Sequence, residues 1–73
     1  MPETMKSKGR VKWFNEAQGF GFIVDENSGA EVYVHHTAIS DPGYKNLTEG
    51  QQVRFEAFRS GPGFQAANVH KIN

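Results

Sequence analysis

The chain has 73 residues, no cysteine and a formal net charge of +0 at pH 7. That length allows a single domain, residues 1–73, of which we expect residues 1–8 to form a flexible N-terminal extension. Without cysteine there are no disulfides or thiolate metal sites, so packing alone must stabilise the fold. The sequence has neither a signal-like apolar run nor a stretch of about 20 apolar residues, so we expect a cytoplasmic protein without a membrane partner.

The charges are unevenly distributed along the chain. In residues 1–12, four basic residues stand against one acid, a net charge of +3, and the remainder has a net charge of −3. The four are Lys6, Lys8, Arg10 and Lys12. Because alternate residues of a strand share a face, they would follow one edge. On charge alone this favours a solvated edge that prevents strand aggregation, whereas beside exposed rings the same edge would contact phosphates.

Five short strands separated by turn residues are predicted, and no segment shows helical periodicity over ten or more residues. The strands cover residues 9–15, 20–24, 31–35, 52–58 and 65–72. A long connection, residues 37–50, joins the third strand to the fourth. This pattern predicts an all-β fold, a five-stranded antiparallel Greek-key β-barrel of the OB-fold type.

The first strand contains one conflict with simple alternation. Val11 and Trp13 would share a face, yet Val11 suits the core. A single tryptophan in a small domain is by default a core anchor, but the neighbouring Phe14 could fill that place. We favour Trp13 outside and Phe14 at least partly inside, with a bulge near Gly9 or a strong twist reconciling the two faces.

Aromatic side chains share faces in two of the predicted strands. Phe20 and Phe22 lie on one face of the second strand, and Tyr33 and His35 on one face of the third. The valines beside Tyr33 suit the core, which leaves the rings facing water. Phenylalanine is usually buried, but the glycines flanking both phenylalanines allow close backbone approach and favour exposed rings. Rings exposed in a row indicate a partner that covers them. Single-stranded nucleic acid suits this role, because an aromatic ring stacks on any nucleobase.

Six short motifs follow one another along the chain. They are Lys12-Trp13-Phe14-Asn15, Gly19-Phe20-Gly21-Phe22-Ile23, Val32-Tyr33-Val34-His35, Gly43-Tyr44-Lys45, Glu49-Gly50-Gln51 and Ala66-Ala67-Asn68-Val69. In order and spacing they resemble the bacterial cold-shock proteins, over about residues 9–69, and the second and third resemble the two ribonucleoprotein motifs of that family. A lone Gly-Phe-Gly-Phe would be weak evidence, because RNA-recognition-motif domains carry a similar stretch. Those domains also need two amphipathic helices, which this sequence does not predict.

The resemblance implies a barrel that binds single-stranded DNA and RNA through a ring-covered face. Family members act as RNA chaperones, and some affect transcription termination. Carried over by position, the stacking platform would be Trp13, Phe20, Phe22, Tyr33, His35, His36 and Tyr44, with Lys12 supplying charge and Arg10, Lys45 and Gln65 as weaker candidates. We expect no enzyme, no cofactor and no small-molecule substrate, and a monomer for which a strand-exchanged dimer stays open.

Four positions depart from the family pattern. Gln18 stands where lysine usually opens the first ribonucleoprotein motif, which removes one phosphate contact. Tyr33 replaces the usual phenylalanine and keeps the ring. His36 stands where phenylalanine is common, so that ring becomes polar and titratable. Phe64 belongs to an extra Gly-Phe step and would either add a stacking ring or anchor its turn.

Three rival functions need separate consideration. The adjacent histidines suggest a metal site with His70, but neighbouring strand residues face opposite ways, so we expect no metal. A small RNA-cleaving enzyme is disfavoured, because the sequence offers no activated nucleophile or paired carboxylates. A protein-interaction module could use the same exposed rings to bind an apolar surface. The role of Phe58, at an outer position of the fourth strand, stays undecided.

Overall fold

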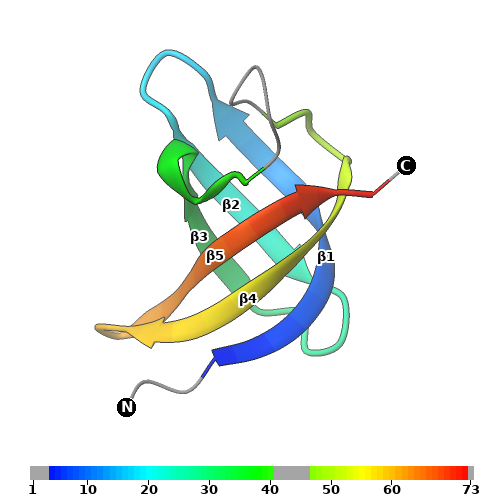
Figure 1. Cartoon of the computed structure of the whole chain (residues 1–73), viewed down its shortest axis with the longest axis vertical. Helices are drawn as coiled ribbons and strands as arrows, with labels where there is room; N and C mark the ends of the chain where they lie inside the picture. Colours follow the sequence, from blue (N-terminus) through cyan, green and yellow to red (C-terminus); the bar gives the residue numbers. More distant parts are fainter. Residues whose placement is uncertain (1–3, 41–46, 73) are drawn as a thin grey trace.

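In the computed structural model, which describes residues 4–40 and 47–72, five strands form a closed barrel (Figure 1). The elements are β1 (Thr4–Asn15), β2 (Phe20–Asp25), β3 (Glu31–His35), the 3-10 turn η1 (His36–Ala38), β4 (Gln52–Ser60) and β5 (Gly63–Lys71). Within the described residues, no helix is long and apolar enough to cross a membrane. The predicted all-β, five-stranded barrel is confirmed.

The strand order around the barrel is β1-β2-β3-β5-β4, and β4 closes onto β1. Neighbouring strands are antiparallel except β3 and β5, which run parallel through the pairs Val32↔Phe64 and Tyr33↔Gln65. The predicted Greek-key barrel is confirmed, and the structure adds that this one contact is parallel. Because the connection after β3 is long, β4 and β5 can form a hairpin whose second strand arrives beside β3 in the same direction.

β1 is longer than the sequence predicted, because it begins at Thr4 instead of Gly9. Residues 4–10 pair with β4, from Thr4↔Phe58 to Arg10↔Gln52, and residues 9–15 pair with β2. The expected N-terminal extension is therefore wrong for residues 4–8, which form part of the barrel wall. Figure 1 shows this bent strand in blue, with the yellow β4 beside its first half.

The core fills the inside of the barrel and comes mainly from alternate residues of each strand. The buried apolar residues are Val11, Ile23, Val32, Val34, Ile39, Leu47, Val53, Phe55, Ala57, Ala66 and Val69. In β3 the buried Val32 and Val34 alternate with Tyr33 and His35, which are partly exposed. The alternation that left these two rings outside is confirmed.

A bulge in β1 resolves the conflict between Val11 and Trp13. The register between β1 and β2 shifts between these two residues, so Lys12 is the extra residue. As a result Val11 is 2% exposed and Trp13 is 38% exposed, while Phe14 packs partly buried against the core. The expected bulge exists, but it lies at Lys12 and not near Gly9.

Asp25, at the end of β2, is a buried carboxylate that holds the β2–β3 turn. It accepts a hydrogen bond of 2.8 Å from the Ser7 hydroxyl of β1, and backbone N–H bonds from Asn27 at 2.8 Å and Ser28 at 3.3 Å. These three bonds compensate the desolvation of the carboxylate. They fix the turn that brings β3 beside β2, and with it the aromatic residues of both strands.

Candidate nucleic-acid interface

Four aromatic rings from three neighbouring strands form one continuous surface on the outside of the barrel. We call the set Trp13, Phe20, Phe22 and Tyr33 the ring platform. The strand register produces it, because Trp13 of β1 pairs with Phe22 of β2, which pairs with Tyr33 of β3. Phe20 lies two residues from Phe22 on the same face of β2.

Each ring of the platform touches two others. Trp13 lies 5.6 Å from Phe20 and 5.4 Å from Phe22 between ring centroids, and Tyr33 lies 6.0 Å from Phe20 and 5.8 Å from Phe22. The Trp13–Phe20 and Phe22–Tyr33 contacts are edge-to-face, at 74° and 75° between ring planes. Such contacts fix the orientation of the rings. The platform is therefore ordered before any ligand arrives, which lowers the entropy cost of binding.

Gly21 permits the close approach of β1 and β2 that brings these rings together. A Cβ at this position would overlap the backbone oxygen of Trp13 and would lie 2.7 Å from the Cα of Phe14. Both obstacles are backbone atoms, so the strands would have to separate. The predicted role of glycine between the two phenylalanines is confirmed for Gly21.

His35 and His36 extend the aromatic surface at the end of β3. Their rings lie 4.4 Å apart, and the Nδ1 of His35 lies 2.8 Å from the hydroxyl of Thr37. The expectation that the two histidines face opposite ways is wrong, because the strand ends at His35 and η1 begins at His36. Gly19, in the turn between β1 and β2, leaves room for the His36 ring, since a Cβ there would lie 2.5 Å from the ring. Its carbonyl accepts a 2.8 Å bond from the backbone N–H of His36.

The cations beside the platform differ in their surroundings. Lys12, in the bulge, forms a 2.7 Å ion pair with Glu31, and the two side chains are about half exposed (49% and 52%). An exposed pair of this kind contributes at most about 1 kcal/mol, so a phosphate can compete with the carboxylate for Lys12. Arg10 lies two pairing steps from Trp13 on β1, opposite Val24.

β5 contributes two further candidates at the opposite border. Gln65 pairs with Tyr33, and Phe64, 36% exposed, lines an open groove together with Gln65, Phe22 and Tyr33. The guanidinium of Arg59 lies 5.6 Å from the Phe64 ring centroid. Since Phe64 lines the groove and remains exposed, its position favours the stacking role over a purely structural one in the turn.

The remaining candidates are placed less directly. Tyr44 and Lys45 lie outside the described residues. Phe58 is partly buried on β4, where it pairs with Thr4 and Gln65. Among residues 4–40 and 47–72, no three histidine, cysteine, aspartate or glutamate side chains are grouped to hold a metal ion.

A closed five-stranded barrel with aromatic residues on one outer face defines the class of oligonucleotide-binding barrels. Comparison with known proteins specifies the family. The model of the 'Cold-shock' DNA-binding domain family matches residues 7–72. The chain therefore belongs to the cold-shock DNA-binding domain family and is a bacterial cold-shock protein.

Individual relatives support this assignment over most of the chain. The Cold shock-like protein CspA of Stigmatella aurantiaca is 52% identical over 64 residues, which cover 88% of this chain and 94% of the relative. The Cold shock-like protein CspE of Escherichia coli is 53% identical over 64 residues, covering 88% and 93%. The Cold shock-like protein CspA of Shewanella violacea is 54% identical over 61 residues, covering 84% and 87%. The family resemblance predicted from the motifs is confirmed, and the protein binds nucleic acid.

Proposed function

We propose that this protein captures unpaired segments of RNA and single-stranded DNA by base stacking and so acts as an RNA chaperone. The observation that supports it best is the ring platform, four mutually contacting rings held on the outside of three strands. Bases in a duplex are covered by their neighbours and cannot stack on these rings. The protein therefore binds melted segments and shifts the equilibrium towards them. Melting a terminator hairpin in this way would also reduce transcription termination.

Stacking provides enough free energy for this function. Each base on an aromatic side chain contributes roughly 1–3 kcal/mol, so three stacked bases contribute roughly 3–9 kcal/mol. Dissociation constants from millimolar to micromolar correspond to about 4 to 8 kcal/mol. Binding in that range is reversible, and reversibility suits a chaperone that must release its RNA.

Phosphate contacts contribute less than stacking in this proposal. The formal net charge is +0, and Lys12 is already paired with Glu31. For single strands the slope of log K against log salt is about −0.7 per phosphate, so two to four contacts give about −1.4 to −2.8. The proposed interface consists of the ring platform with Lys12, His35, His36 and Gln65, extended by Arg10 and Phe64 and, outside the described residues, by Tyr44 and Lys45.

Binding in this proposal occurs without catalysis, in the cytoplasm and by a monomer. The platform is an open outer face of a barrel and has no walls that could exclude water from a reaction. A protein-interaction module remains the second candidate, because exposed aromatic side chains also favour protein partners. Basic residues beside the rings favour nucleic acid over this alternative.

An RNA hairpin with a fluorophore and a quencher at its two ends tests the chaperone activity. We expect the wild-type protein to open the hairpin without ATP and increase the fluorescence. The double variant Phe20→Ala/Phe22→Ala should lose this activity while circular dichroism still reports a folded barrel. Hairpin opening that is unchanged in the folded double variant would contradict the proposal.

A further inference from the structure

A row of basic residues crosses the barrel wall on the strands β1, β4 and β5, and shares β1 with the platform. Lys8 of β1 pairs with Arg54 of β4, and Arg54 pairs with His70 of β5. Lys8 and Arg54 are exposed, and His70 is partly exposed. Cross-strand neighbours of like charge repel each other, so this register costs stability in the absence of an anion.

Lys8 and Arg54 lack the neutralisation found at Lys12. Within residues 4–40 and 47–72, no carboxylate forms an ion pair with Lys8, Arg54 or the nearby Lys6. By contrast, Lys12 has its carboxylate partner at 2.7 Å. The positive charges of Lys8 and Arg54 are therefore available to a ligand.

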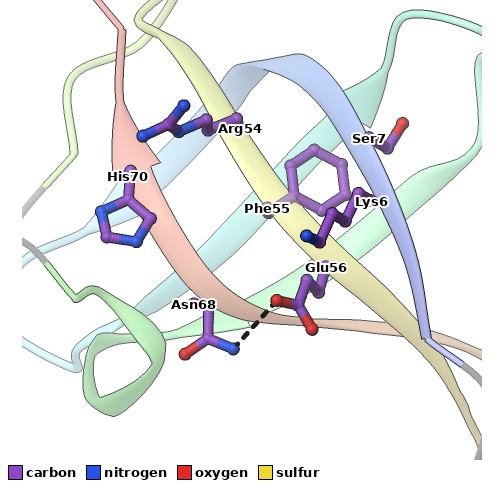
Figure 2. A pocket seen from close by; sticks show the side chains of 7 residues that line it. All are labelled: Lys6, Ser7, Arg54, Phe55, Glu56, Asn68 and His70. Atoms are coloured by element: carbon purple, nitrogen blue, oxygen red, sulfur yellow. Dashed lines mark hydrogen bonds between the residues drawn. The ribbon is translucent and has the colours of Figure 1, made fainter.

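The wall is hollowed where the row meets β5. The register between β4 and β5 shifts between Arg54 and Glu56, opposite Asn68, whose φ is 52°. The hollow is lined by Lys6, Ser7, Arg54, Phe55, Glu56, Asn68 and His70. Figure 2 shows the Arg54 and His70 side chains on neighbouring strands, and the bond from the Asn68 amide to the Glu56 carboxylate at 3.3 Å. Bulges of this kind commonly shape binding sites.

The hollow has donors suited to a phosphate group. A guanidinium, an ammonium and an amide N–H₂ can each donate to phosphate oxygens. Glu56 is the one carboxylate among the lining residues, and it already accepts from Asn68. The negative charge of Glu56 opposes anion binding. Removing this charge should therefore tighten the binding of a phosphate group.

The row is continuous with the platform along β1. Lys8 and Arg10 lie on the outer face of β1, on the side of the bulge away from Trp13. The barrel measures only 30 × 21 × 19 Å. A single strand of nucleic acid that leaves the platform past Arg10 therefore reaches Lys8 and Arg54 within one barrel width.

We propose that the Lys8–Arg54–His70 row and the adjoining hollow form a second phosphate-binding surface, which the backbone of a long single strand reaches after its bases have filled the ring platform. The proposal rests on the proposed function and adds a contact that short oligonucleotides do not make. It predicts two classes of ligand by length. Short strands bind by stacking with a shallow salt dependence, and long strands bind with additional phosphate contacts.

The test compares oligothymidylates of about 6 and about 16 nucleotides, within the range of site sizes of such barrels. Binding is measured by fluorescence anisotropy for the wild type and for Lys8→Gln/Arg54→Gln. Two lost phosphate contacts change the slope of log K against log salt by about 1.4 for the long strand. Between about 50 and 200 mM salt, the wild-type affinity for that strand should therefore fall about sevenfold more than that of the variant.

Matched variants separate this surface from a general charge effect. Arg54→Gln is compared with Lys71→Gln, which removes the same charge from β5 at a position that does not line the hollow. We expect Arg54→Gln to weaken long-strand binding more than Lys71→Gln, and Glu56→Gln to tighten it. None of the three should change the affinity for the short strand.

Three results would overturn the proposal: equal losses for short and long strands, equal effects of Arg54→Gln and Lys71→Gln, or a salt slope of the long strand that the double variant leaves unchanged. Tight binding of an acidic peptide by the row, with no effect of strand length, would identify a protein partner instead. If the ring platform did not bind nucleic acid, Phe22→Ala would leave short-strand binding unchanged. This result separates failure of the proposed function from failure of the second surface.

Discussion

Replacing Phe22 should weaken nucleic-acid binding far more than replacing Lys12, the cation that precedes Trp13 in β1. Phe22 contacts Trp13 and Tyr33, as Phe20 does, and in addition lines the groove beside Phe64. Loss of one stacked base costs roughly 1–3 kcal/mol, which is a factor of about 5 to 150 in Kd. Lys12→Gln removes a cation that Glu31 already partly neutralises, so we expect less than about a fivefold loss.

The assay is a titration with a short oligothymidylate at one fixed salt concentration, followed by fluorescence anisotropy. Phe22→Leu serves as the matched control, because it keeps an apolar side chain on β2 but removes the ring. Both Phe22 variants should lose affinity, since stacking needs the flat ring. Full affinity in Phe22→Leu, or a loss in Lys12→Gln as large as that in Phe22→Ala, would refute the reasoning that stacking dominates.

Two further predictions concern the residues that shape the platform. Gly21→Ala should destabilise the barrel by about 1–3 kcal/mol, because its Cβ would meet the backbone of β1; an unchanged midpoint of urea unfolding would contradict this. Asp25→Ala should cost about 2 kcal/mol, because Ser7 and two backbone N–H groups lose a charged acceptor; thermal unfolding measures it, and a wild-type melting temperature would disprove it.

Local alternation was sufficient to predict where the rings of β2 and β3 would lie. In β3 the pattern Val32-Tyr33-Val34-His35 assigns each side chain to a face without knowledge of the partner strands, and the structure confirms it. Gly21 could likewise be understood from sequence, because a glycine between two outward rings indicates close backbone approach.

The features that depend on pairing between distant segments could not be predicted. Residues 4–8 are polar enough to suggest an extension, and their strand conformation depends on pairing with β4, about 50 residues away in the sequence. The bulge at Lys12 is likewise set by the register with β2. The facing positions of Lys8 and Arg54 depend on the same non-local register, so the basic row was invisible in the sequence.

At the turn after β3, the predicted orientation of two side chains was wrong for a local reason. Strand alternation predicted that His35 and His36 face opposite ways, yet their rings lie 4.4 Å apart. The chain leaves the strand between them, and the cap formed by His35 with Thr37 starts η1. A three-residue turn leaves no periodic signal in a sequence.

Tryptophan fluorescence of the pure protein, titrated with a short oligothymidylate at low and moderate salt, tests the central claim most directly. Trp13 is the single tryptophan of the chain and a member of the ring platform. We predict quenching that saturates, with an affinity that is only mildly reduced by salt. An unquenched Trp13 in a protein shown to be folded by circular dichroism would contradict the stacking platform and would make the protein-interaction module the leading candidate.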